Sequence, residues 1–169
     1  MGMKKRKPNR LPGYDYSQEG YYFVTICTQD RVESLGKVEN GAMVLSQEGG
    51  IVERCWKAIP QHYHGVELDQ FIIMPNHVHG IIAIVEAEQC SASTEKKQNN
   101  YGLLSKIIKS FKDITVKTIR KEISNVAFGW QRSFYDHIIR NEKSLNDTRQ
   151  YVIENSLKWQ FDEENLFAK

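Results

Sequence analysis

The segment MPNHVHGII (residues 74–82) holds two histidines separated by one residue, directly before an apolar run. In a β-strand, residues i and i+2 project from one face, whereas residue i+1 points to the other. His77 and His79 would therefore stand side by side, with Val78 facing the opposite layer. Two neighbouring imidazoles can share one divalent cation, and imidazole suits Mn, Fe, Co or Zn better than Mg. The pair is a candidate metal site.

The same spacing recurs in IPQHYHGVE, where His62 and His64 lie between a proline and a glycine. We interpret that second pair as structural or surface histidines, because a loop does not fix their separation. His77 and His79 could likewise be two half-exposed histidines at the end of a hydrophobic strand. Spacing alone therefore leaves metal binding open, and the wider pattern has to decide.

Strands are expected on both sides of the histidine pair. β-Branched and aromatic runs predict three of them: YYFVTICTQD (21–30), VELDQFIIM (66–74) and VHGIIAIV (78–85). The last two are joined through a Pro-Asn turn. Between the first two, Asn40-Gly41 predicts a tight hairpin. Ser46 is a suitable N-cap for a helix through QEGGIVERCWKAI.

The second half of the chain predicts a helix, a strand and a closing helix. Apolar residues recur at helical spacing from Leu103 to about Glu122, with cations on the opposite side. FGWQRSFYDHIIR predicts a strand, and KSLNDTRQYVIENSLKW a final helix with Ser144 as a plausible N-cap. This order predicts an α+β fold: a ferredoxin-like split βαβ core, with an antiparallel sheet, helices on one face and an additional C-terminal helix.

Length and composition indicate one globular domain. The 169 residues, 40% of them hydrophobic, are sufficient for a core. We expect a single domain over 1–169, in which 1–12 is a basic arm, 87–100 a flexible loop and 160–169 a tail. The absence of any apolar run near the ~20 residues of a membrane span favours a cytoplasmic protein without membrane contact.

Cysteines and charge narrow the class of protein further. Three widely spaced cysteines (Cys27, Cys55 and Cys90) indicate neither a disulfide framework nor a zinc knuckle. The net charge of +2 is too small to imply nucleic acid by itself. Positive charge gathers in KKRKPNR and along 106–121, however, which hints at an anionic partner.

Four blocks, in this order, resemble the single-tyrosine HUH transposases, and most closely their REP-associated tyrosine transposase branch: FIIMPNHVHGIIAIV, LLSKIIKSFK, GWQRSFYDHIIRNEKSL and YVIENSLKW. The likeness covers roughly residues 10–160. In that family, a histidine–hydrophobe–histidine motif binds the metal and a tyrosine on the last helix is the nucleophile. A polar side chain one turn later completes the metal site.

Carried over to this chain, the resemblance implies Tyr151 as the nucleophile and Asn155 as the third metal ligand beside His77 and His79. Residues i and i+4 lie on one helix face, so helix geometry permits this pairing. The implied cofactor is a divalent metal ion, Mg²⁺ or Mn²⁺. One departure from the family is Asn-Ser-Leu, where this branch often has Asn-Pro-Leu, which leaves the end of the helix open.

Two residues of the predicted strand FGWQRSFYDHIIR compete for a place in the site. Tyr135 is a rival tyrosine, but it lacks an in-phase polar residue that matches the ligand of the family. His137 is a possible neighbour of the site, against the alternative of a structural histidine.

By the same resemblance, the chain is a metal-dependent single-stranded DNA endonuclease and strand transferase that forms a 5′-phosphotyrosine intermediate at palindromic DNA hairpins. The alternatives are a metal-dependent phosphodiesterase that uses activated water, or a non-catalytic protein that binds DNA hairpins. Both a monomer and a homodimer are compatible with the sequence. DNA contacts are expected from basic residues of the arm and of the long helix: Lys4, Lys5, Arg6, Lys7, Arg10, Lys106, Lys109, Lys117, Arg120 and Lys121.

Overall fold

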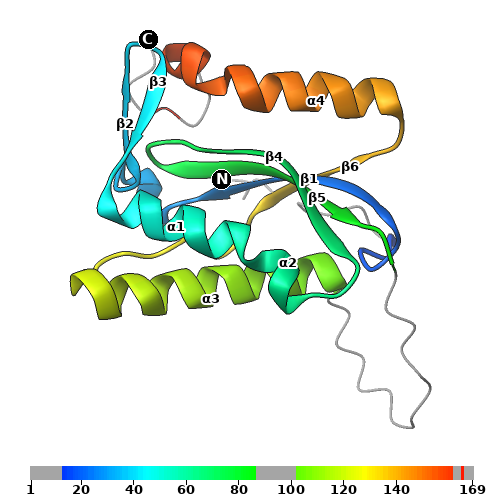
Figure 1. The fold of residues 1–169 in the computed structure, drawn as a ribbon, viewed down its shortest axis with the longest axis horizontal. Coiled ribbons are helices and arrows are strands. Elements are labelled where there is room, and N and C mark those ends of the chain that lie inside the picture. Colours follow the sequence, from blue (N-terminus) through cyan, green and yellow to red (C-terminus); the bar gives the residue numbers. More distant parts are fainter. Residues whose placement is uncertain (1–12, 87–101, 162–164, 166–169) are drawn as a thin grey trace, which may run out of the picture.

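Four strands form one antiparallel sheet in the order β4-β5-β1-β6 (Figure 1). The computed structural model describes residues 13–86, 102–161 and 165. Helices lie in the crossover from β1 to β4 and in the crossover from β5 to β6, so the predicted ferredoxin-like split βαβ arrangement is confirmed. The strands are β1 (Gly20–Cys27), β4 (Val66–Ile73), β5 (His77–Ile84) and β6 (Tyr135–Ile139).

Helices cover the two faces of this sheet unequally. Helices α1 (Gln47–Lys57) and α3 (Leu103–Ile123) pack on one face, and the short α2 (Ile59–His62) follows α1. Helix α4 (Glu142–Glu154) lies on the other face and continues into the 3₁₀ helix η2 (Asn155–Phe161). Figure 1 shows α4 above the sheet and α3 below it. The predicted C-terminal helix is thus confirmed, and it forms a layer of its own.

A small hairpin leads from β1 into α1. Its strands are β2 (Gly36–Glu39) and β3 (Ala42–Leu45), and the short 3₁₀ helix η1 (Gln29–Arg31) precedes them. Asn40 and Gly41 both have positive φ, 51° and 76°, as a type I′ turn requires. The Ser46 hydroxyl accepts the Gly49 backbone N–H at 3.0 Å. Both the hairpin and the N-cap predicted from the sequence are therefore confirmed.

Two predicted strands are shorter than expected. The strand predicted over 21–30 ends at Cys27, because Asp30 and Arg31 adopt positive φ, 53° and 55°. The strand predicted over FGWQRSFYDHIIR is regular only in β6. Before it, the Lys112 ammonium donates to the carbonyl oxygens of Gln131 and Ser133, at 2.8 and 2.9 Å. A lysine thus satisfies backbone groups that a neighbouring strand would have bonded.

The start of the last helix also differs from the prediction. Its N-cap is Asn141, whose side-chain oxygen accepts the backbone N–H of Ser144 at 2.8 Å. Ser144 was the expected cap, but it lies inside the first turn and is the capped residue. At the other end, the α-helix gives way to η2 at Asn155, so the Asn-Ser-Leu segment continues as a tighter 3₁₀ helix.

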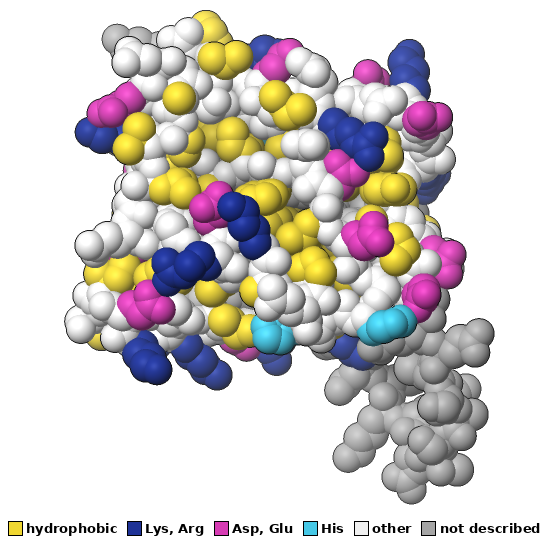
Figure 2. Space-filling model, viewed as in Figure 1, with side chains coloured by type: hydrophobic (Ala, Val, Ile, Leu, Met, Phe, Trp, Pro, Cys, Tyr) yellow, Lys and Arg dark blue, Asp and Glu magenta, His cyan; other side chains and the backbone are white. Residues whose placement is uncertain are grey.

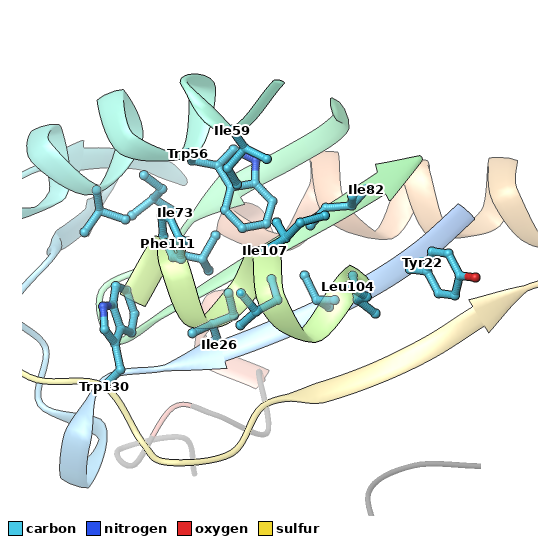
Figure 3. Close-up of a cluster of buried hydrophobic side chains, with 14 of the residues drawn as sticks. Tyr22, Ile26, Trp56, Ile59, Ile73, Ile82, Leu104, Ile107, Phe111 and Trp130 are labelled. Carbon is cyan, nitrogen blue, oxygen red and sulfur yellow. The ribbon is translucent and has the colours of Figure 1, made fainter. Parts of the chain in front are cut away.

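The main core fills the space between the sheet and the α1/α3 layer (Figure 3). The Trp56 ring packs edge-on against Phe111, with ring centroids 5.2 Å apart. A smaller apolar cluster lies under α4 and consists of Phe23, Ile81, Ile139, Leu145 and Val152. The fold is therefore stabilised mainly from the α1/α3 side. Residues of the main core labelled in Figure 3 are Tyr22, Ile26, Trp56, Ile59, Ile73, Ile82, Leu104, Ile107, Phe111 and Trp130.

Several expectations fall on residues whose structure is not described. The arm over 1–12, the loop over 87–100 and Cys90 lie outside the described residues, as does most of the tail over 160–169. Within the described residues, Cys27 and Cys55 take part in no disulfide. Among the helices described, none is long and apolar enough to cross a membrane.

A close approach of β5 to α1 yields a stability prediction. A Cβ on Gly80 would lie 2.3 Å from Cζ2 of Trp56, whose ring is fully buried. We expect Gly80→Ala to lower the free energy of unfolding by ~1–3 kcal/mol through overpacking, measured by urea denaturation. Gly50→Ala in α1 is the control, since nothing lies within 4 Å of the added carbon, and it should stabilise by ~0.5–1 kcal/mol. Equal stability of Gly80→Ala and wild type would contradict the packing described.

Candidate active site

Strand β5 directs His77 and His79 toward the face of the sheet that α4 covers. The centroids of the two imidazole rings are 4.2 Å apart. Both side chains are buried, 0% and 3% exposed, so they are not the half-exposed pair that the sequence left open. On the β1 side, His79 pairs with Thr25 and His77 with Cys27. The central strand thus holds the rings at a fixed separation, because both of its edges are hydrogen-bonded.

The chemistry of His77 is determined by its neighbour Asn76. The Nδ1 atom of His77 lies 2.8 Å from the side-chain oxygen of Asn76, which is only an acceptor, so Nδ1 carries the proton. Its Nε2 atom is buried and has no hydrogen-bond partner among the residues described. Burial lowers the pKa of His77 from 6.5 to about 3. His77 therefore presents a neutral imidazole with a free lone pair, the form that binds metals.

His79 is positioned by three neighbours. Its Nδ1 lies 2.9 Å from the Thr25 hydroxyl on β1. Phe23, on the same face of β1, stacks on the imidazole with ring centroids 5.3 Å apart. Its Nε2 lies 3.3 Å from the hydroxyl oxygen of Tyr151. These contacts fix the ring plane and direct Nε2 toward α4.

Tyr151 reaches the histidines from α4. The preceding linker is short, and Leu145 and Val152 anchor the helix against the sheet of its own chain. The Tyr151 ring packs edge-on against Phe23, with ring centroids 6.0 Å apart. The residue as a whole is 45% exposed, so a solute can reach its side chain from outside. A phenol that is accessible yet held next to two imidazoles is arranged as a nucleophile would be.

Asn155 lies where α4 ends and η2 begins. It is 2% exposed, one turn after Tyr151. Further along η2, the Trp159 ring lies next to His77, with ring centroids 5.9 Å apart. The polypeptide after Tyr151 therefore passes over the histidine pair. The predicted residues Tyr151, His77 and His79 lie together, and Asn155 is buried on the segment that closes over them.

The donor set fits a divalent cation of borderline character. Two imidazoles and an amide would supply two nitrogens and one oxygen, which suits Mn²⁺ better than Mg²⁺. The buried, unpartnered Nε2 of His77 is the observation that carries this fit. Within the described part of the chain, no three His, Cys, Asp or Glu side chains converge. A cation here would thus keep its charge largely uncompensated by the protein and favour an anionic ligand.

The two other candidates of the sequence occupy the edge strand β6. Tyr135 pairs with Thr25 and His137 with Phe23, so both stand on the same face of the sheet as His79. Each is exposed, Tyr135 by 53%. Strand β1 separates them from the histidine pair. They border the site, whereas Tyr151 is the tyrosine that contacts it. The second histidine pair lies on the surface, where the Nδ1 atom of His64 is 3.1 Å from a carboxylate oxygen of Glu86.

The predicted DNA-binding residues of the long helix lie in a different layer from Tyr151. Helix α3 is on the opposite face of the sheet from α4 (Figure 1). Basic side chains project along the lower edge of the molecule in Figure 2, where α3 lies. The structure does not bring this basic face next to the histidine pair. Its exposed cations are Lys106, Lys109, Lys117, Arg120 and Lys121. Lys4, Lys5, Arg6, Lys7 and Arg10 lie outside the described residues.

Sequence reasoning missed four residues that build the site. Asn76 could have been found, because an amide directly precedes the first histidine in PNHVH. Phe23, Thr25 and Trp159 carried no such signal. Their roles depend on the register between β1 and β5 and on the path of η2.

Comparisons with known proteins agree with this architecture. The chain is 35% identical over 170 residues to an uncharacterized protein of Haemophilus influenzae, covering 96% of this chain and 94% of that protein. It is 26% identical over 150 residues to a second protein of that organism, named "Putative REP-associated tyrosine transposase", covering 85% of this chain and 74% of the relative. No family model matches the chain.

Among solved structures, a REP-associated tyrosine transposase bound to a REP hairpin superposes with a TM-score of 0.55 at 18% identity. The match covers 96% of this chain and 77% of that chain. The chain is therefore similar in sequence to a protein named as a REP-associated tyrosine transposase, and it shares the fold of a solved member of that class.

The buried state of His77 yields a pH prediction for the metal-free protein. The folded-state pKa, about 3, lies below the value of 6.5 for the free side chain. Between these values the unfolded chain binds more protons, so stability falls as the pH falls below 6.5. From about pH 6.5 to about pH 5.5, wild type should lose about 1 kcal/mol more unfolding free energy than His77→Phe. Urea titrations in the presence of a chelator measure this, and parallel losses in both proteins would refute it.

Proposed function

We propose that the protein is a metal-dependent transposase that cleaves and rejoins single-stranded DNA at hairpins through a covalent tyrosine intermediate. The observation that carries the proposal is the contact of the Tyr151 hydroxyl with His79 Nε2, at 3.3 Å, made by a side chain that is 45% exposed. The similarity to a protein named as a REP-associated tyrosine transposase supports transposase-type chemistry. The solved relative bound to a REP hairpin supports hairpin DNA as the partner.

The reaction follows from the residues at the site. The phenol oxygen of Tyr151 attacks the scissile phosphorus, the P–O3′ bond breaks, and the DNA leaves a 5′-phosphotyrosine and a 3′-hydroxyl. The phenol proton departs and the 3′-oxygen gains one, so atoms and charge balance. Because the phosphotyrosine retains the energy of a phosphodiester, attack by another 3′-hydroxyl rejoins strands without a nucleotide cofactor.

The metal would be held by His77 and His79, with Asn155 as the third ligand. When bound there, a divalent cation polarises the phosphate and offsets the charge of the transition state. The Tyr151 hydroxyl and a bound cation would compete for the same atom, His79 Nε2, so the contact seen here and a bond to the cation are alternatives. A free phenol has a pKa near ~10, and positive charge near Tyr151 would favour the phenolate.

DNA beyond the cleavage point has a candidate surface on the α3 side. Helix α3 and the segment before β6 form a groove of about 680 Å³. The partly buried Phe134 supplies aromatic surface in it, the core residue Trp130 lies at its base, and the only acid among its lining residues is Asp113. Cations beside aromatic rings suit single-stranded DNA, because the former bind phosphate and the latter stack on bases. The cations of the groove are Lys106, Lys109, Lys112 and Arg132.

The central test is incubation of labelled hairpin DNA with Mn²⁺, followed by a denaturing gel. Wild type should give a slower protein–DNA band. Tyr151→Phe should abolish that band, and His77→Ala should reduce its rate of formation by at least about a hundredfold. Chelation of the metal should slow formation of the band as His77→Ala does. Binding of Mn²⁺, measured by calorimetry without DNA, should weaken in His77→Ala and be retained in Tyr151→Phe.

Two outcomes would assign the protein to another class. If Tyr151→Phe still cuts the hairpin, the protein is a phosphodiesterase that uses activated water. If wild type binds the hairpin and never forms a covalent band, the site serves DNA binding without catalysis.

The α3 groove yields a separate prediction for affinity. We expect Lys109→Gln and Arg132→Gln each to weaken hairpin binding and to reduce the slope of log K against log salt by about 0.7–0.9. Lys57→Gln in α1, paired with Glu53 at 2.8 Å, is the control and should leave the slope unchanged. Fluorescence anisotropy at several salt concentrations measures the slopes. Unchanged slopes in both groove variants would exclude this surface.

A further inference from the structure

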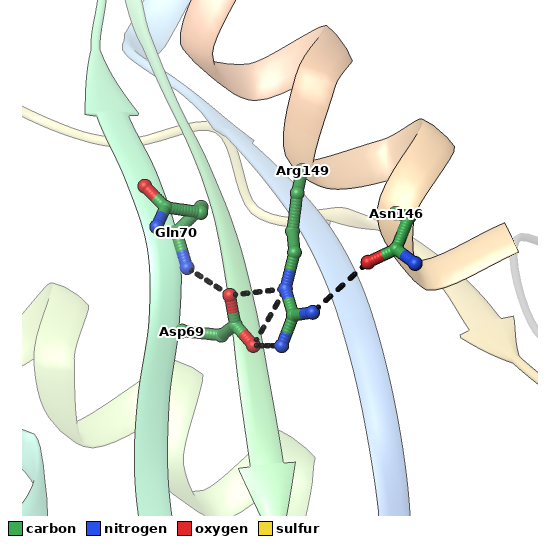
Figure 4. A network of polar contacts seen from close by, with 4 residues as sticks. All are labelled: Asp69, Gln70, Asn146 and Arg149. Atoms are coloured by element: carbon green, nitrogen blue, oxygen red, sulfur yellow. Dashed lines mark hydrogen bonds and ion pairs between the residues drawn. The ribbon is translucent and has the colours of Figure 1, made fainter. Parts of the chain in front are cut away.

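An ion pair joins the edge strand β4 to the helix that carries Tyr151 (Figure 4). The Arg149 Nε atom donates to both carboxylate oxygens of Asp69, at 3.0 and 3.1 Å, and Nη2 donates to Oδ2 at 2.5 Å. Nη1 of the same guanidinium donates to the Asn146 side-chain oxygen at 3.1 Å. The Asp69 side chain is 13% exposed, so the pair is largely shielded on the strand side. This is a directional, bidentate contact.

A local irregularity of β4 points Asp69 at the helix. The pairing of β4 with β5 shifts register between Leu68 and Phe71, so Asp69 and Gln70 lie in a bulge. The Gln70 backbone N–H donates to Asp69 Oδ1 at 2.7 Å and holds the carboxylate. Bulges of this kind re-aim side chains and occur often beside active sites. The strand therefore orients the carboxylate independently of its contact with Arg149.

Helix α4 meets the sheet along a narrow apolar stripe. Of its thirteen residues, Leu145 and Val152 are the buried ones, and both belong to the apolar cluster under the helix. Arg149 lies between them at helical spacing, whereas Tyr151 projects from another side of the helix, where its ring contacts Phe23 and His79. A rotation of about 20° would move a group ~6 Å from the helix axis by about 2 Å. Displacements of this size are enough to disable a positioned nucleophile.

We propose that Asp69 and Arg149 are positioning residues that fix the rotation of α4 and thereby hold the Tyr151 hydroxyl over the histidine pair. The proposal rests on the proposed function for its catalytic consequence. It differs from a general stabilising role, because the main core lies on the opposite face of the sheet. Loss of the pair should therefore disturb α4 and leave the rest of the fold intact.

The test is a double-mutant cycle of Arg149→Met and Asp69→Asn, with Arg149→Lys as the conservative variant. At saturating DNA and Mn²⁺, each single variant should form the covalent adduct at least tenfold more slowly. The double variant should be no slower than either single one, because the two side chains act as a unit. The rate of adduct formation in Arg149→Lys should lie between those of wild type and Arg149→Met, since lysine retains the charge but lacks the planar guanidinium that forms the bidentate contact. Hairpin affinity should stay within about twofold, because the pair contacts no DNA in this proposal.

The matched control is Arg54→Met. Arg54 and Glu122 form a 2.7 Å ion pair between α1 and α3, in the layer remote from Tyr151. This variant should form the adduct at the wild-type rate. It controls for the loss of an arginine–carboxylate pair as such.

Amide hydrogen exchange gives a second readout that needs no activity. Exchange over 142–154 should accelerate in Arg149→Met and Asp69→Asn, while exchange over 103–123 stays at the wild-type rate. Unchanged exchange in α4, multiplicative effects in the double variant, or adduct formation within twofold of wild type would each overturn the proposal. If wild type forms no adduct, the proposed function fails, and the exchange rates of the cycle alone then decide whether the pair orients α4.

Discussion

The alternation of side chains along β5 is the constraint on which the rest of the structure depends. This central strand is bonded on both edges and buried on both faces. His77 and His79 point toward α4, whereas Val78, Gly80 and Ile82 point toward the α1/α3 layer. A slip of one residue would exchange the two sets and bury the imidazoles in the apolar core. Tight packing against Gly80 and pairing with β1 therefore determine the register and place the histidines.

One face of the sheet carries most of the apolar packing, and the other carries the candidate site. The α1/α3 side holds the large apolar core, including Trp56 and Phe111. The α4 side has a thinner apolar cluster and carries the polar groups around His79. A layer with few apolar contacts can be held by directional polar interactions, and the Asp69–Arg149 pair is such an interaction. Rigid support from one face thus permits an accessible site on the other.

The sequence blocks that carry the family resemblance converge on two regions of the molecule. FIIMPNHVHGIIAIV and YVIENSLKW meet where Tyr151 approaches His79. The second region lies on the opposite side of the sheet, where α3 and the segment before β6 form one groove. It is built by LLSKIIKSFK and the first part of GWQRSFYDHIIRNEKSL. In the proposed function, the first region performs the cleavage chemistry and the second contacts the DNA chain at a distance.

The sequence by itself determined the elements and the types of reactive residues. Local signals predicted the histidines on one strand face, the Asn40-Gly41 hairpin and the Ser46 cap, and the one-turn spacing of Tyr151 and Asn155 is also local. Such signals depend on neighbours within a few residues, and these are visible in a linear chain. The end of the strand after Cys27 and the irregular path before β6 were not visible, because distant partners, such as Lys112, satisfy the backbone there.

Only the tertiary structure decided which residues surround the histidines. Thr25 and Phe23 reach His79 through the pairing of β1 with β5, across more than fifty residues of chain. Arg149 meets Asp69 across eighty residues, and only because a bulge turns the carboxylate toward α4. The placement of α3 on the face opposite Tyr151 was equally undetermined by the sequence. Amphipathic periodicity shows that a helix has a buried side, but packing of the whole chain selects the face that buries it.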